Sequence, residues 1–170
     1  LLRQGIKRIL SYEDDIEVVG EAGDGQEALT RTLVMHPDIL LLDINMPVLN
    51  GLDVARQLRA AKSPTKIVAL TINDGSEYVL EILTAGALGY LLKDIDPTLF
   101  VRAIRTVAQG RMFVDAKIAE RLFGGECSDE ELQDRVAELW RENQAVHLTA
   151  REMEVIACIA RGCSNRDIAE

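Results

Sequence analysis

The chain has 170 residues, of which 48% are hydrophobic and 28% charged, and its formal net charge is -9. This length is enough for one ordinary domain and part of a second. The acidic excess argues against a nucleic-acid-binding surface spread over the whole chain. No apolar stretch reaches the roughly 20 residues needed to span a bilayer, and no signal peptide is recognisable, so a cytoplasmic protein with no membrane partner is expected. Three cysteines without a C-x-x-C pair predict neither a disulfide framework nor a zinc site.

The first part of the chain is predicted to alternate between strands and helices through residue 110. An opening helix with apolar residues at helical spacing is followed by strands at 17–22, 38–43, 66–71 and 89–93. Further helices are expected at 25–35, 51–61, 76–85 and 97–109. Near-continuous apolar strands that alternate with helices indicate an α/β fold, a doubly wound parallel sheet covered on both faces.

The pattern changes after Gly110. Residues 112–123 are predicted as a short helical connector, and a capping box at Ser128 starts a helix to about residue 141. That second helix could pack on its own domain or pair with a second subunit. A further capping box at Thr149 opens a helix to about Ala160. We therefore expect a first domain at 1–110, a helical linker at 111–146 and the start of an all-α domain at 147–170.

Polar residues stand at the carboxyl ends of three predicted strands. Asp43 follows the apolar run 39–42, Thr71 closes the next strand, and Lys93 closes the one after. Ligands of doubly wound sheets bind beyond these strand ends, where loops admit them and strands fix the side chains. Each of these residues has an ordinary structural interpretation by itself, as a cap, a turn former or a solvated lysine. Their joint occurrence predicts a single site.

Two sets of motifs occur along the chain. The first set is Asp43-x-x-Met46-Pro47-x-x-x-Gly51, Thr71 after Ile67-Val68-Ala69-Leu70, and Gly89-Tyr90-Leu91-Leu92-Lys93-Asp94. The second set is Leu148-Thr149-x-Arg151-Glu152 and Ala160-x-Gly162-x-Ser164-Asn165-x-x-Ile168-Ala169. By the first set, residues 1–110 resemble the receiver domain of bacterial two-component response regulators. By the second, residues 148–170 resemble the start of a LuxR-type helix-turn-helix, and together they resemble the NarL/FixJ family.

The resemblance implies a role for each receiver residue. Asp43 would accept a phosphoryl group from a sensor histidine kinase, and it would ligate Mg²⁺ together with the backbone carbonyl of Asn45. Thr71 would donate its hydroxyl to a phosphoryl oxygen, and Lys93 would pair with the phosphate. Tyr90 would change rotamer with Thr71, and the altered surface would switch homodimerisation and DNA binding. Such a regulator is not an enzyme beyond self-phosphorylation and autodephosphorylation.

The second motif implies contact with DNA. By resemblance, Arg151, Asn165 and Arg166 would touch DNA phosphates. The helix that reads base edges is the second one of such a motif, and the sequence stops before it. We therefore expect the 170 residues to be a fragment that does not bind DNA sequence-specifically.

Three other interpretations remain open at this stage. Gly23-x-Gly25-x-x-Ala28 after a strand resembles a dinucleotide-binding fingerprint. A haloacid-dehalogenase-like phosphatase also forms an aspartyl phosphate, but it needs a second aspartate where Asn45 stands. A receiver-like interaction module that signals without phosphate would keep the fold and lack the chemistry.

The family's first strand and the acidic pair that follows it have no match in the sequence. In the family's order that strand is central, between those ending at Ala22 and Asp43, so its absence would leave backbone groups of both neighbours unpaired. We expect the parent protein to contain the strand and its acidic pair. Mg²⁺ binding and phosphorylation are accordingly expected to be weak or absent in the 170 residues and efficient in the parent.

Overall fold

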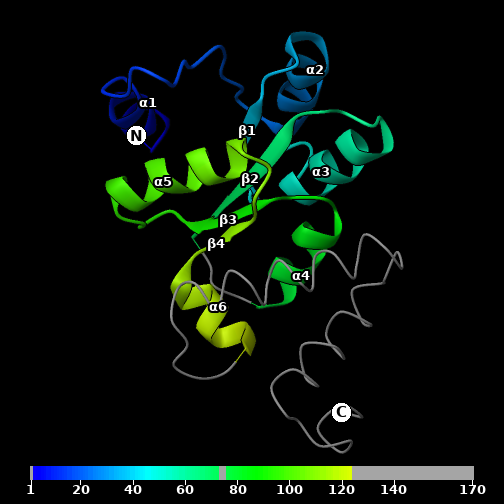
Figure 1. Cartoon of the computed structure of the whole chain (residues 1–170). Helices are drawn as coiled ribbons and strands as arrows, with labels where there is room; N and C mark the ends of the chain where they lie inside the picture. Colours follow the sequence, from blue (N-terminus) through cyan, green and yellow to red (C-terminus); the bar gives the residue numbers. More distant parts are fainter. Residues whose placement is uncertain (1, 73–75, 124–170) are drawn as a thin grey trace, which may run out of the picture.

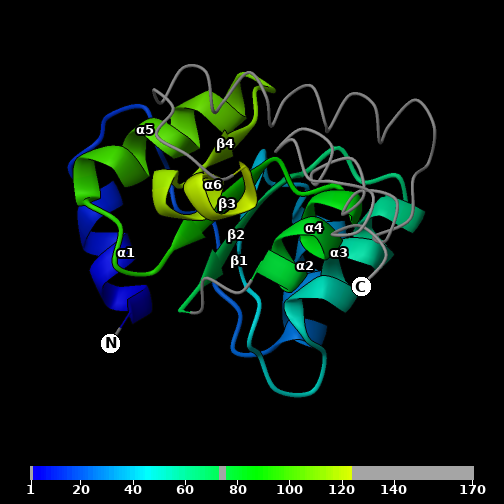
Figure 2. The same ribbon diagram turned by 90° about the horizontal axis from the view of Figure 1, so that it is seen from below.

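The computed structural model describes residues 2–72 and 76–123 and shows a parallel sheet with helices on both faces (Figures 1 and 2). Neighbouring strands pair in parallel in the order β1-β2-β3-β4. The strands are β1 (Ile39–Asp43), β2 (Lys66–Thr71), β3 (Gly89–Leu92) and β4 (Phe113–Val114). The predicted doubly wound α/β class is confirmed.

The helices divide between the two faces of this sheet. Figure 2 shows α1 and α5 on one side and α2, α3 and α4 on the other. Their bounds are α1 (Leu2–Leu10), α2 (Gly25–Met35), α3 (Gly51–Ala60), α4 (Ser76–Thr84), α5 (Pro97–Ala108) and α6 (Ala116–Phe123). Among the described helices, none has the length and apolar character that crossing a bilayer requires.

Successive residues of each strand point to opposite faces of the sheet and pack in two separate hydrophobic cores. Leu42, Ile67 and Tyr90 pack with residues of α2, α3, α4 and α6. Val68 and Leu91 point to the opposite face and pack with residues of α1 and α5. This alternation follows from the two-residue period of a strand, and it explains why both faces of each predicted strand are apolar.

Local capping starts the helices where the sequence predicts. The carboxylate of Asp24 accepts from the backbone N–H of Glu27 and caps α2. Asp96 accepts from two N–H groups at the start of α5, where Pro97 occupies the first turn. Each cap satisfies donors that the first turn of a helix leaves without partners.

Two predicted elements are wrong. Residues 17–22 do not form a strand, although their composition favours one. Residues 112–123 are not wholly helical, because Phe113 and Val114 form β4 beside β3 before α6 begins. Val114 and Ile118 are buried in the core under α4, so the same core includes residues beyond 110.

The expected helices at 128–141 and 149–160 lie outside the described residues. The predicted linker and all-α domain therefore stay predictions.

Candidate functional site

Asp43 and Lys93 meet at the carboxyl edge of the sheet. Asp43 is the last residue of β1, and Lys93 directly follows β3. The Nζ of Lys93 lies 2.5 Å from Oδ2 of Asp43, although the two residues are 50 positions apart. The Asp43 side chain is 32% exposed and that of Lys93 15%, so this ion pair is sheltered while the carboxylate stays open to a reactant. The two residues meet because the strands are parallel, so that their carboxyl ends lie at the same edge of the sheet.

The backbone around Asp43 fixes the direction of its carboxylate. Oδ1 accepts a 2.9 Å hydrogen bond from the N–H of Asn45, which leaves Oδ2 facing Lys93. The N–H of Ile44 donates to the carbonyl of Leu70, and the N–H of Gly51 donates back to the carbonyl of Ile44. The loop after β1 is therefore folded tightly against the end of the sheet.

Gly51 is required by a close approach of two backbone segments. A Cβ at this position would stand 2.4 Å from the carbonyl oxygen of Asp43 and 2.8 Å from the Cα of Ile44. Such distances are far below normal contact, so a side chain here would push α3 away from the strand end. The glycine in the sequence motif is thus explained by packing beside the candidate site.

Thr71 and Tyr90 lie on the strands beside this pair. Thr71 ends β2, is 3% exposed, and its carbonyl accepts a 2.8 Å hydrogen bond from the N–H of Lys93. Tyr90 is fully buried and pairs in register with Ala69, two residues before Thr71. Residues two apart share a face, so Tyr90 is a diagonal neighbour of Thr71. The structure thus brings together the four residues predicted for acceptor and switch.

Two exposed apolar residues flank the site, and the sequence patterns single out neither. Val48, in the loop after β1, is 83% exposed, and Ile72, directly after β2, is 74% exposed. Val48 also has φ of 68°, a left-handed conformation that a β-branched residue seldom adopts. Sequence carries no signal for this conformation, because valine ordinarily predicts extended backbone.

The described residues do not by themselves fit a tight Mg²⁺ site. Mg²⁺ prefers six oxygens in octahedral geometry. The Asp43 carboxylate and the backbone carbonyl of Asn45 are the predicted donors, and Lys93 already holds one oxygen of that carboxylate. Within residues 2–72 and 76–123, no group of three or more histidine, cysteine or acidic side chains could hold a metal ion.

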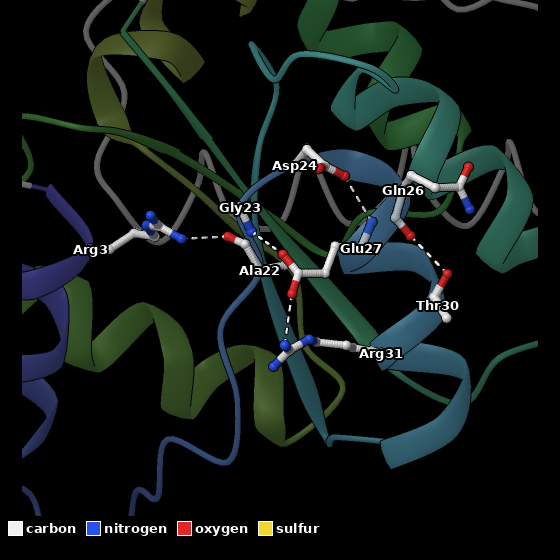
Figure 3. A network of polar contacts seen from close by, with 8 residues as sticks. All are labelled: Arg3, Ala22, Gly23, Asp24, Gln26, Glu27, Thr30 and Arg31. Carbon is white, nitrogen blue, oxygen red and sulfur yellow. Dashed lines mark hydrogen bonds and ion pairs between the residues drawn. The ribbon is translucent and has the colours of Figure 1, made fainter.

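The start of α2 does not support dinucleotide binding. Residues 17–22 are not a strand, so the required strand-turn-helix unit is absent from this part of the described chain. Figure 3 shows the first turn occupied by acids: Asp24 accepts from the N–H of Glu27, whose own carboxylate accepts from the N–H of Gly23 at 2.6 Å. These carboxylates would repel a pyrophosphate from N–H groups that such a ligand needs.

Gly25 has a packing explanation as well. A Cβ there would stand 1.9 Å from the carbonyl oxygen of Leu49, in the loop that follows Asp43. The glycine lets α2 approach this loop, which removes the need for a ligand to explain it.

The residues predicted to touch DNA are Arg151, Asn165 and Arg166. All three lie outside the described residues, and their roles stay predictions.

Comparison with known proteins agrees with this geometry. Residues 1–105 match the family described as response regulator receiver domain. Transcriptional regulatory protein DegU of Brevibacillus brevis is 36% identical over 176 aligned residues, which cover 100% of this chain and 75% of DegU. Nitrate/nitrite response regulator protein NarP of Escherichia coli is 36% identical over 169 residues, covering 99% of this chain and 74% of NarP.

Solved structures of response regulators are also similar to this chain. The receiver domain of the response regulator NarL from Mycobacterium tuberculosis has 39% identity and a TM-score of 0.63, covering 65% of this chain and 89% of that one. A LuxR-family two-component response regulator from Aurantimonas has 32% identity and a TM-score of 0.67, covering 70% of this chain and 85% of that one. The chain therefore belongs to the response regulator receiver family, and its relatives place it among the two-component response regulators of the NarL/LuxR type.

Proposed function

We propose that this protein accepts a phosphoryl group on Asp43 from a sensor histidine kinase and uses it to switch dimerisation and DNA binding, which regulates transcription. The observation that carries the proposal is the 2.5 Å contact between Oδ2 of Asp43 and Nζ of Lys93 at the carboxyl edge of the sheet. A cation is thereby already in place where new negative charge would arrive.

The chemistry assigns a task to each side chain. An oxygen of Asp43 attacks phosphorus, the bond from phosphorus to the donor breaks, and the donor leaves with that electron pair. The product carries close to two negative charges on the phosphoryl group. We expect Lys93, which already contacts Asp43, to pair with a phosphoryl oxygen, and the hydroxyl of Thr71, on the adjacent strand β2, to donate to another.

Strands β2 and β3 also connect the phosphorylation site to the residues expected to change conformation. Thr71 and Lys93 are joined through their backbones, so a shift of either toward the phosphoryl group is passed to the other. Tyr90 lies on β3, opposite Ala69, and its buried ring is on the same face of the sheet as Thr71. A displacement of Thr71 would therefore alter the space available to that ring. A coupling of about 1 to 3 kcal/mol is typical for such a two-state response.

Mg²⁺ and DNA are the remaining ligands of this proposal. Asp43 and the backbone carbonyl of Asn45 are expected to hold Mg²⁺ together with the predicted acidic pair, because the described residues supply too few ligands. Arg151, Asn165 and Arg166 are expected to contact DNA.

Labelling by acetyl phosphate tests the acceptor. A form of the protein that carries the predicted acidic pair should be phosphorylated with Mg²⁺ present, and Asp43→Asn should abolish the label. Asp53→Asn, which changes an exposed aspartate in the first turn of α3, is the matched control and should label normally. Phosphorylated protein is counted by intact mass.

The outcomes separate the alternatives. Undiminished labelling of Asp43→Asn would contradict the assignment of the acceptor. Absence of any labelling in a folded, Mg²⁺-loaded form would favour a receiver-like module that signals without phosphate. Equal labelling of the 170-residue chain and the longer form would show that the acidic pair is not needed.

A further inference from the structure

Residues 113–123, which include β4 and α6, form an arm attached to the edge of β3. The N–H of Phe113 donates to the carbonyl of Leu88, and the N–H of Asp115 donates to the carbonyl of Tyr90, each at 2.9 Å. β4 is only two residues long. The attachment of the arm to the sheet is therefore short, and it includes the predicted switch residue Tyr90.

The buried face of α6 packs in the core that contains Tyr90. Ile118 is 1% exposed and Ala119 is 0% exposed, and both belong to the same hydrophobic core as Tyr90 and Ile82 of α4. The helices α6 and α4 are in contact (Figure 1). The position of the Tyr90 ring is therefore part of the packing that holds α6.

Asp115 joins the first turn of α6 to β3. Its Oδ1 accepts a 3.0 Å hydrogen bond from the N–H of Lys117, and its carbonyl accepts from the N–H groups of Ile118 and Ala119. Since the N–H of the same residue is bound to the carbonyl of Tyr90, a shift of β3 at Tyr90 is passed directly to the start of the helix.

An ion pair links α6 to the residue that follows Lys93. The Nζ of Lys117 lies 3.4 Å from Oδ2 of Asp94, and Asp94 is the next residue after Lys93. Both side chains are exposed, so this pair is weak and easily broken. The contact between Asp43 and Lys93 thus lies one residue away from a second connection to the arm.

We infer that phosphorylation of Asp43 loosens the arm from β3 and α4. A phosphoryl group on Asp43 draws Lys93 and Thr71 toward it. The shift reaches the arm through Tyr90 in the core and through Asp94 at the surface. A close-packed core fits one arrangement of its side chains, so a displaced ring makes the present position of α6 less favourable. Because the phosphoryl group is the signal, this role of the arm rests on the proposed function.

The coupling between the site and the arm must act in both directions. If an occupied site weakens the attachment of the arm, a weaker attachment must raise the affinity of the site by the same factor. Damage to a purely structural element would instead lower that affinity or leave it unchanged. The sign of the effect therefore distinguishes a coupled arm from a structural one.

Hydrogen exchange in the presence of beryllofluoride, a reversible mimic of a phosphoryl group, tests the coupling. The mimic is added with Mg²⁺ to the longer form of the protein that carries the predicted acidic pair. The N–H groups of Phe113 and Asp115 should exchange about fivefold faster when the site is occupied, which is the low end of a typical coupling. Amides of β1 and β2 should not change, since a general loosening of the sheet would expose them too.

Substitutions in the arm test the reverse direction by calorimetric titration with beryllofluoride. Ile118→Ala should raise the affinity about fivefold, because it removes buried contacts of α6. Leu10→Ala is the matched control: it truncates a side chain that is 4% exposed in the core on the other face of the sheet, and it should not raise the affinity. Lys117→Gln changes an exposed residue, so the fold is expected to be retained, and exchange of the Asp115 amide should be about twofold faster.

The outcomes separate the arm from the acceptor. Unchanged or slower exchange at Phe113 and Asp115 in protein that binds beryllofluoride would overturn the coupling and leave the proposed acceptor in place. Equal effects of Ile118→Ala and Leu10→Ala on the affinity would do the same. If folded, Mg²⁺-loaded protein did not bind beryllofluoride at all, the proposed function would be contradicted and the role of the arm with it.

Discussion

At the residue scale, the candidate site depends on backbone contacts as much as on the reactive side chains. Asp43 is aimed by the N–H of Asn45, and Lys93 is held to β2 by the carbonyl of Thr71. Gly51 lets the first turn of α3 rest against the carbonyl of Asp43. Each contact restricts where the carboxylate can point, and a restricted nucleophile is what in-line transfer requires.

Gly51→Ala is predicted to damage this arrangement. The new Cβ must displace backbone at the end of β1, and overpacking of this kind costs about 1 to 3 kcal/mol of unfolding free energy. Phosphorylation of Asp43 should slow as well. Urea unfolding followed by circular dichroism and acetyl phosphate labelling measure the two effects.

Gly5→Ala is the matched control for that substitution. Gly5 lies within α1, with nothing within 4 Å of a Cβ built on it. Replacing a helical glycine in open space should raise the unfolding free energy by about 0.5 to 1 kcal/mol. Equal effects of the two substitutions would contradict the packing explanation for Gly51.

Much of the candidate site could be predicted from the sequence. Asp43, Thr71 and Lys93 each follow a short apolar run, and parallel strands bring such residues to one edge. The left-handed backbone of Val48 and the exposed position of Ile72 could not be predicted, because both depend on how the loops close over the sheet.

At the element scale, the segment 17–22 shows that strand propensity is not sufficient. A strand requires a neighbour that takes its N–H and C=O groups. Within the described residues β1 pairs only with β2, and residues 17–22 are held instead by polar contacts to α1. Arg3 donates to the carbonyl of Ala22 at 2.7 Å, and Lys7 pairs with Glu21 at 2.6 Å. The strand that would lie between this segment and β1 stays a prediction.

An ion-pair cluster joins α5 to the segment after α1. Arg105 contacts Glu13 and Asp15 at 2.6 Å each, and its hydrogen bond to Asp15 is the main cause that lowers the pKa of Asp15 below its ordinary value of 3.8. A lowered carboxyl pKa contributes stability above the unfolded pKa, and this contribution is lost as pH falls through the folded pKa. Arg105→Gln should therefore reduce stability at pH 7.

The pH dependence of Arg105→Gln distinguishes this ion pair from a packing effect. The difference in urea midpoint from the unsubstituted protein should shrink below the ordinary pKa of 3.8, and it should also shrink in high salt because the pair is exposed. Arg102→Gln changes another exposed arginine of α5 and should show neither trend. A difference that persists unchanged at low pH would contradict the electrostatic explanation.

At the scale of the whole molecule, one sheet separates two hydrophobic cores and couples them. Ile82 of α4 packs in the core beneath α2, α3 and α4, and Ile104 of α5 packs in the core beneath α1 and α5. Both side chains are at most 5% exposed. Each strand contributes residues to both cores, so loss of the sheet removes both together.

The effects of substitutions in the two cores on the unfolding free energy are predicted to be additive. Ile82→Val and Ile104→Val should each lower the unfolding free energy by about 0.5 to 1.5 kcal/mol, because each removes one buried methylene. The double variant should show their sum to within about 0.5 kcal/mol in a single urea transition, since the sites share no partners. Two separate transitions would indicate that the faces unfold independently.

The sequence by itself determined the fold class, most helix starts and the identity of the residues at the strand ends. These features depend on local periodicity, on capping side chains and on the order of strands along the chain. The tertiary structure alone decided that Asp43 and Lys93 touch, that Phe113 and Val114 become a strand and that residues 17–22 do not. The physical reason is that hydrogen-bond partners between strands and contacts between distant side chains exist only after the chain has folded, whatever the local propensity of each segment.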